Sequence, residues 1–210
     1  MASWDKITVQ QFQDIHRLSI TADIDTDTKV ERVVSIVYDK TEREVEEMLL
    51  KDFNKAAKEC SFLLTDQIPG KPVREIKTNG RRYAIEYNPR KLKYRQYIEV
   101  LTYASKPIEN LHLIMASIVN PVRWGIKQKN KTEDHDAIAA DIQEAKMTDV
   151  YNSCVFFCKL YTNSIRVIQP SLVEEMMKTK KISQSEAETI VAASIEFMAG
   201  LSQQKSSPTL

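Results

Sequence analysis

The stretch VREIKTNGRRYAIEY (residues 73–87) carries the clearest β-strand signal in the sequence. Asn79-Gly80 is the pair best suited to a type I′ turn, because both central positions of that turn need positive φ. With the turn there, Thr78 faces Arg81, and the apolar side chains gather on one face: Ile76, Tyr83, Ile85 and Tyr87. An isolated two-stranded hairpin is marginal in water, so this face is expected to pack against helices.

Helical patterns dominate the sequence before this hairpin. Apolar residues recur at the i, i+3, i+4, i+7 spacing of one helix face at Val30, Val33, Val34 and Val37. Thr41 and Glu44 fit a capping box, which opens a short helix with three inward residues: Val45, Met48 and Leu49. A longer helix is expected through residues 53–64. The breakers in DQIPGKP (66–72) then end this helical part of the chain.

Helices are also predicted after the hairpin. Apolar stripes place one around residues 97–101 and another over 108–118, which ends at Asn120-Pro121. Residues 122–135 are polar and aperiodic, and we expect an exposed loop. Further helices follow at about 134–146, 147–163, 171–180 and 184–199. Capping boxes open the last two, and a C-cap closes the final one: Ser171 with Glu174, Ser183 with Glu186, and Gly200.

Together these patterns predict a mainly α-helical fold with one inserted antiparallel β-hairpin at about 73–87. We expect a single domain over residues 1–200. Within it, residues 1–68 could form an N-terminal helical subdomain, followed by the hairpin and helices of 73–200. Residues 201–210 (LSQQKSSPTL) are expected to form a disordered tail.

The composition is that of an ordinary globular chain. Its 210 residues are 42% hydrophobic and 28% charged, which argues against intrinsic disorder. Only four Gly are present, which argues against glycine-rich phosphate-binding loops. We see no secretion signal and no apolar run of the length that spans a membrane. Three cysteines, an odd number, suit a reducing cytoplasm.

The net charge of +1 conceals an uneven distribution. Residues 1–70 carry 9 basic and 14 acidic side chains, residues 71–131 carry 14 and 4, and residues 132–210 carry 7 and 11. A basic middle segment therefore lies between two acidic ones. Either these segments neutralise one another within the fold, or the basic segment forms an exposed face that binds an acidic partner or phosphates.

The basic residues concentrate in RRYAIEYNPRKLKYRQY (81–97), which holds six Lys or Arg and four Tyr. Interleaved bases and aromatics suit a groove for single-stranded nucleic acid. However, most of these Tyr fall on predicted buried faces, where they cannot stack on bases. We therefore favour a protein-docking or packing role and disfavour nucleic-acid binding. The candidate partner-binding residues are Arg81, Arg82, Arg90, Lys91, Lys93 and Arg95.

No catalytic, metal-ligating or cofactor-binding motif is recognisable. Cys154 and Cys158 share a helical stripe with apolar residues, as does Cys60 on its own helix, so buried thiols are expected rather than a zinc site. The three His are scattered along the sequence. The acidic run from Asp23 to Asp27 lacks the Gly and Glu that a calcium loop requires. We predict a non-enzymatic protein without cofactor or metal.

Several short motifs, in this order, resemble those of a phage protein class. Trp4, Thr8, Val9, Phe12 and Ile15 open the chain, and a Cys-x-Phe-Leu ends the first helical block. IKTNGRRY (76–83), QYIE (96–99) and ENLHLIMASIVNP (109–121) follow. This series, over about residues 4–165, resembles small proteins from the structural-gene region of tailed bacteriophages, especially phages of Bacteroidetes, and is tail-assembly-chaperone-like. The resemblance implies a helical protein that serves virion morphogenesis, and no catalytic residues.

Two functions in different classes follow as hypotheses. The first is an assembly factor that binds tail or tape-measure subunits in the host cytoplasm. The second is a component retained in the virion, such as a connector ring or a cargo protein. The partners would be phage structural proteins (tail, tape-measure or connector subunits), no membrane is expected, and homo-oligomer formation stays open. A nucleic-acid-binding module is the third and weakest hypothesis.

Overall fold

The N-terminal part of the chain is helical. The structure is a computed structural model and describes residues 2–65, 67–123, 126–127, 134–180, 183–186, 188–189 and 192. A 3₁₀ turn and five helices come first: η1 (Trp4–Lys6), α1 (Val9–Ile20), α2 (Thr26–Tyr38), α3 (Glu42–Glu46), α4 (Leu50–Glu59) and α5 (Phe62–Thr65). Polar N-caps start α1, α2 and α3, since Thr8, Asp25 and Thr41 each accept a hydrogen bond from a backbone N–H of the first turn.

Three features predicted for this part of the chain differ in their outcome. The capping box of Thr41 and Glu44 is confirmed, because each side chain accepts from the other's backbone N–H. The prediction that Leu49 faces inward is wrong: it is the N-cap residue of α4 and 73% exposed. The single helix expected over 53–64 is instead broken between α4 and α5 near Cys60, whose N–H bonds back to the last turn of α4.

The hairpin lies where the sequence predicted it. Strands β1 (Glu75–Thr78) and β2 (Arg81–Ile85) are antiparallel, with Ile76 opposite Tyr83 and Thr78 opposite Arg81. The turn residues Asn79 and Gly80 have φ of 48° and 69°, which is the positive φ that a type I′ turn needs at both positions. The predicted register is therefore confirmed.

The sheet is larger than one hairpin. β3 (Val119–Arg123) pairs antiparallel with β2, and β4 (Ile126–Lys127) pairs with β3. The prediction of an exposed loop from residue 122 is wrong for these residues, and residues 124–125 and 128–133 lie outside the described part. The sequence conceals β3 because Pro121 lies opposite Tyr83 within it. Proline is rare inside strands, so Asn120-Pro121 suggested only the end of a helix.

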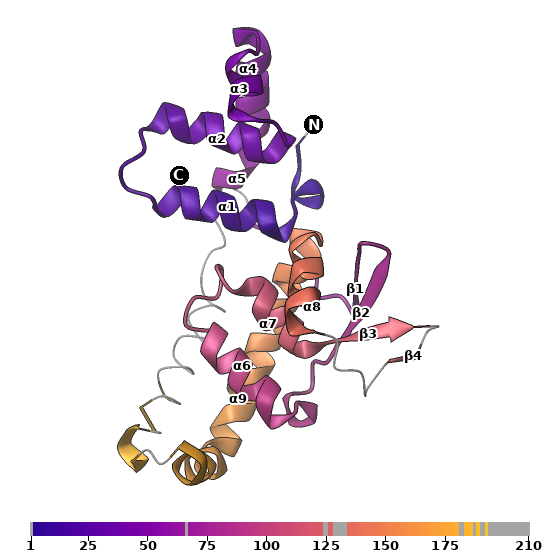
Figure 1. The fold of residues 1–210 in the computed structure, drawn as a ribbon, viewed down its shortest axis with the longest axis vertical. Helices are drawn as coiled ribbons and strands as arrows, with labels where there is room; N and C mark the ends of the chain where they lie inside the picture. Colours follow the sequence, from indigo (N-terminus) through magenta and orange to yellow (C-terminus); the bar gives the residue numbers. More distant parts are fainter. Residues whose placement is uncertain are drawn as a thin grey trace.

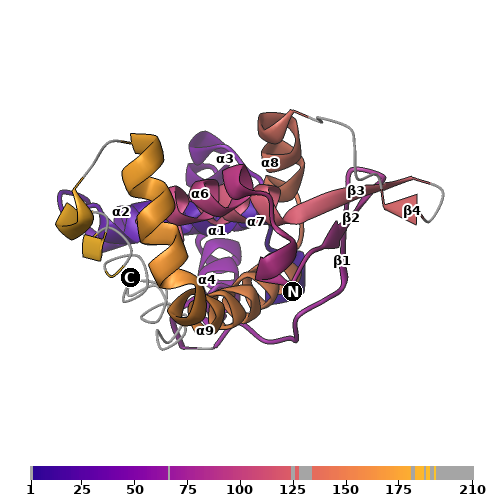
Figure 2. The ribbon, with the colours of Figure 1, turned by 90° about the horizontal axis from the view of Figure 1, so that it is seen from below.

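The remaining elements are helical: η2 (Pro89–Lys91), α6 (Tyr94–Tyr103), α7 (Leu111–Ile118), α8 (His135–Gln143) and α9 (Met147–Lys180). Two helices were expected over 147–163 and 171–180, with a cap at Ser171. Instead α9 continues through Pro170, so that prediction is wrong. The helix changes direction in its C-terminal part (Figure 2), which is the usual effect of proline inside a helix.

Near the C-terminus, the predicted capping box of Ser183 and Glu186 is confirmed. Gly200 and the tail 201–210 lie outside the described residues. The fold is thus mainly helical with a small antiparallel sheet. None of the described helices combines the length and apolar character needed to cross a membrane.

In space, α1 and α2 lie side by side above α6–α9, with α3 and α4 at the far end and the sheet to one side (Figure 1). The buried apolar side chains nevertheless form one cluster that runs from Trp4 to Tyr161. Backbone hydrogen bonds join the two halves: Met147 N–H donates to the Ile7 carbonyl at 2.9 Å, and Val9 N–H to the Ala145 carbonyl at 3.0 Å. The start of α1 is thereby fixed against the start of α9.

Candidate protein-binding surfaces

Three of the six candidate partner-binding residues form ion pairs within the chain. Arg81 contacts Asp141 of α8 at 2.9 Å, Arg95 contacts Glu99 one turn along α6 at 2.7 Å, and Arg82 contacts Glu75 on the neighbouring strand β1. For these three residues, acidic side chains of the same chain thus supply the negative charge that the basic segment needs.

The other three, Arg90, Lys91 and Lys93, are exposed. None of them forms an ion pair with another residue in the described ranges. Arg90 and Lys91 belong to η2, and Lys93 is the N-cap residue of α6. We refer to Arg90, Lys91 and Lys93 as the basic turn. Positive charge at the start of a helix interacts unfavourably with the helix dipole. The three charges of the basic turn therefore do not stabilise α6.

The tyrosines of the same segment are largely committed to packing. Tyr83 is fully buried and Tyr97 nearly so, whereas Tyr87 is half-buried and its hydroxyl donates to the Val73 carbonyl. Tyr94, the first residue of α6, is 40% exposed. A stacking platform for several bases is therefore not formed by these four rings.

A second surface, which the sequence did not predict, is a groove of about 510 Å³ between α2, α3 and α4. Its apolar lining is Val30, Val45, Met48, Leu50 and Phe53, and its polar lining is Asp27, Thr28, Glu31 and Glu46. We call it the acidic groove. Leu50 is 74% exposed. The sequence pattern gave no sign of this groove, because it placed Leu49 inward together with Val45 and Met48.

The charges of the acidic groove are all of one sign. Its lining contains three carboxylates and no Lys, Arg or His. Asp27, Glu31 and Glu46 form no ion pair with any residue that the structure describes. Apolar contacts combined with uncompensated negative charge favour a ligand that is apolar and cationic.

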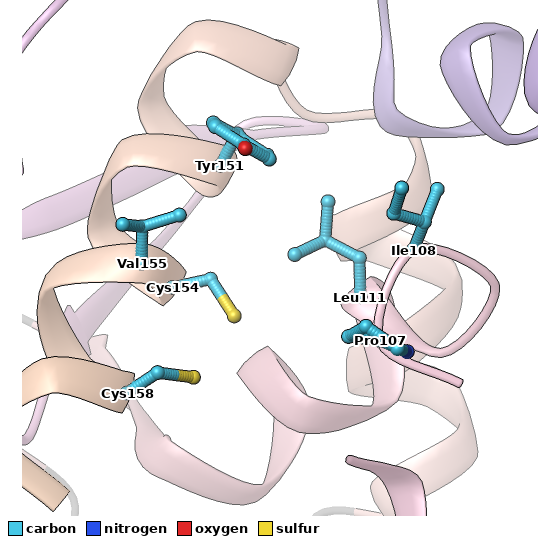
Figure 3. Close-up of a pocket in the computed structure, with 7 residues that line it drawn as sticks. All are labelled: Pro107, Ile108, Leu111, Tyr151, Cys154, Val155 and Cys158. Carbon is cyan, nitrogen blue, oxygen red and sulfur yellow. The ribbon is translucent and has the colours of Figure 1, made fainter. Parts of the chain in front are cut away.

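The cysteines are buried, as the sequence predicted. Cys154 and Cys158 point from α9 toward the segment that begins α7 (Figure 3), beside an apolar void of about 10 Å³. That volume holds at most a single water. The hydrogen bond with Cys158 and burial raise the pKa of the Cys154 thiol, and burial raises the pKa of Cys60 to about 11. Thiols in this state are poor nucleophiles and poor metal ligands.

Among the described residues, no group of three or more His, Cys, Asp and Glu is arranged to hold a metal ion. The histidines, scattered in sequence, all lie in α1, α7 and α8. Gln13 of α1 contacts Nδ1 of His112 on α7, and Ser117 of α7 contacts Nε2 of His135 on α8. Sequence spacing could not show these contacts between side chains of α1, α7 and α8, because they are produced by the packing of the three helices.

Comparisons with protein-family models, with curated proteins and with solved structures found no match to this chain.

Proposed function

We propose that this chain is a non-enzymatic protein-binding factor of tailed-phage morphogenesis, tail-assembly-chaperone-like, which binds tail or tape-measure subunits in the host cytoplasm. The observation that carries the proposal is the basic turn. Arg90, Lys91 and Lys93 are exposed at the start of α6 and lack ion pairs with described residues, whereas the bases beside them in sequence are paired internally. Charges left in this state are available to steer and orient an acidic partner.

The phage assignment rests on the ordered motifs of residues 4–165. The docking role is supported by the position of the aromatic rings. Because Tyr83 and Tyr97 belong to the core, the segment offers its positive charge without a set of exposed rings. That combination fits the surface of an acidic protein better than it fits single-stranded nucleic acid.

Binding of purified tail-tube, tape-measure and connector subunits from the phage that encodes the chain tests this function. The key variant is the triple reversal R90E/K91E/K93E, with K51E/K55E/K58E as its control. The control changes three exposed lysines of α4, so both variants change the net charge equally. We expect the basic-turn reversal to weaken binding, most strongly at low salt, and the control to bind like wild type. Equal binding by all three proteins would contradict the proposed docking face.

A structural component of the virion, such as a connector ring, is the second candidate. The observation that favours it is the acidic groove, whose charge is opposite to that of the basic turn. Quantitative proteomics of purified particles separates the two functions. A chaperone is absent from mature particles, whereas a connector is present in a small fixed copy number.

A further inference from the structure

The acidic groove has the properties of a docking site. Its apolar lining includes Leu50 on the surface and Phe53 and Met48 half-buried behind it. Covering exposed apolar area is favourable in proportion to that area. The three carboxylates of the lining favour a segment that presents cations beside an apolar or aromatic side chain.

The basic turn presents that chemistry. Its three cations lie within four residues of sequence, and Tyr94 follows Lys93 directly with 40% of its side chain exposed. An aromatic ring can enter an apolar groove while its hydroxyl stays at the edge. On each surface, three charges thus lack an ion pair with any described residue, and the cations of one match the carboxylates of the other.

The two surfaces cannot meet within one molecule. α3 and α4, which line the acidic groove, lie at the top of Figure 1, whereas α6, which begins at the basic turn, lies in the lower half. Contact between them therefore requires two molecules.

We propose that the basic turn of one copy of this chain docks in the acidic groove of a second copy. The contact is heterologous, so within a pair one molecule keeps its groove free and the other keeps its basic turn free. Such contacts generate a ring if the rotation between copies closes, and an open filament if it does not. This contact rests on the same basic turn as the proposed function. It assigns to the acidic groove one occupant, the basic turn of a second copy.

Sedimentation velocity of the full chain over a concentration series, at low and at moderate salt, tests the proposal. We expect the mass of wild type to rise above the 24.2 kDa of the single chain with concentration, and salt to reverse the rise. Two variants, R90E/K91E/K93E and E31K/E46K, alter one surface each. Each alone should weaken self-association by about tenfold or more. Mixed in equal amounts they should associate again, because the intact groove of one meets the intact turn of the other.

Substitution of exposed leucine tests the apolar part of the contact. L50S should weaken association, whereas I20S, which changes a 61% exposed isoleucine outside the groove lining, should not. Circular dichroism and thermal unfolding establish that every variant is folded. A wild type that stays monomeric at low salt, or a mixture that stays monomeric, overturns the proposal and leaves the groove to a different polypeptide. If wild type is monomeric while R90E/K91E/K93E loses its phage partner, the proposed function stands without self-association.

Discussion

The side-chain amide of Gln13 on α1 holds His112 on α7 in its neutral form. Nε2 of Gln13 lies 2.9 Å from Nδ1 of His112, and also 2.9 Å and 2.8 Å from the carbonyl oxygens of Ile108 and Glu109. Carbonyl oxygens only accept, so the amide must present its NH₂ group here. An NH₂ group does not accept, so a proton on Nδ1 of His112 would face a donor, and Nδ1 is therefore unprotonated.

This relationship predicts a loss of stability in mild acid. Burial lowers the pKa of His112, and the nearby charges of His135 on α8 and Arg17 on α1 act in the same direction. Burial also lowers the pKa of His16, although Glu109 opposes it. The unfolded chain then binds more protons than the folded chain, so the free energy of unfolding should decrease as pH falls below about 6.5.

The variant H112Q isolates one contributor to this pH dependence. Its amide oxygen can still accept from Gln13 but does not titrate, so the acid-induced loss should be smaller than in wild type. We expect H112Q to cost about 1 kcal/mol at neutral pH. Urea denaturation across a pH series measures both effects, and the doubly substituted H16Q/H112Q should flatten the dependence further. An unchanged pH profile in H112Q would contradict the assignment.

Asp141 of α8 fixes the tip of the hairpin. It accepts hydrogen bonds from Asn79 Nδ2 at 3.1 Å, from Arg81 Nη1 at 2.9 Å and from the Tyr83 hydroxyl. Burial alone would raise the pKa of Asp141, but these hydrogen bonds outweigh it and the pKa is lowered. Its side chain is 13% exposed, so removal of the carboxylate leaves the buried Tyr83 hydroxyl without its acceptor.

We therefore expect D141A to destabilise the chain by about 1–3 kcal/mol. The matched control is E75A, which removes a more exposed carboxylate, that of the pair with Arg82, and should cost less than about 1 kcal/mol. Chemical denaturation at neutral pH compares them. Because the folded-state pKa of Asp141 is depressed, its contribution should be lost as pH falls below about 3.9, where the unfolded chain becomes protonated. Equal costs for D141A and E75A would exclude the anchoring role.

The type I′ turn makes Gly80 the sensitive position of the hairpin. A Cβ atom added at Gly80 meets no other atom within 4 Å, so the cost of substitution comes from the backbone alone. G80V places a β-branched residue at φ of 69° and should destabilise by about 1–2 kcal/mol. Denaturation midpoints of G80V and wild type, with equal m-values, provide the measurement. A neutral substitution would mean that the turn does not need positive φ there.

The success of the hairpin prediction and the failure to find β3 have one physical basis. Asn-Gly reports a local requirement for positive φ, and a two-residue turn then fixes the register of both strands. β3 depends instead on pairing with β2, far away in sequence, and its Pro121 disguises it. The acidic groove was not predicted for the same reason. Whether Leu49 faces inward depends on where α4 packs, and the apolar spacing near Val45 does not specify that position.

The candidate site was predictable only in part. Sequence located the basic cluster, but it could not separate the basic turn from Arg81, which is paired with Asp141 sixty residues later. Likewise, α9 continues through Pro170, although proline lacks a backbone N–H and locally favours the end of a helix.

Cys154 and Cys158 are predicted to be structural. They are almost completely buried, beside a void that C154A/C158A would enlarge (Figure 3). We expect the double variant to lose about 1–3 kcal/mol of stability, with no change in metal content by elemental analysis of protein purified without added metal. Stoichiometric zinc in wild type, lost in the variant, would show instead that the thiols are ligands.

The basic turn is not expected to bind single-stranded nucleic acid tightly. Of the four tyrosines in residues 81–97, Tyr94 is the most exposed, while Tyr83 and Tyr97 lie in the core. Stacking supplies about 1–3 kcal/mol per base in proteins that bind single strands, so one partly exposed ring cannot support such binding. We expect filter binding with single-stranded DNA and RNA to detect no more than weak, non-specific retention.

The rival interpretation demands a measurable salt dependence. Three phosphate contacts from Arg90, Lys91 and Lys93 would give a slope of log K against log salt of about −2, because each contact on a single strand contributes roughly −0.7. Wild type would need micromolar affinity with this slope, and R90E/K91E/K93E would have to abolish it while K51E/K55E/K58E did not. That combination would assign the basic turn to phosphate binding and remove the support for protein docking. Loss of binding in both variants would reflect net charge alone, and the turn would then keep its proposed role.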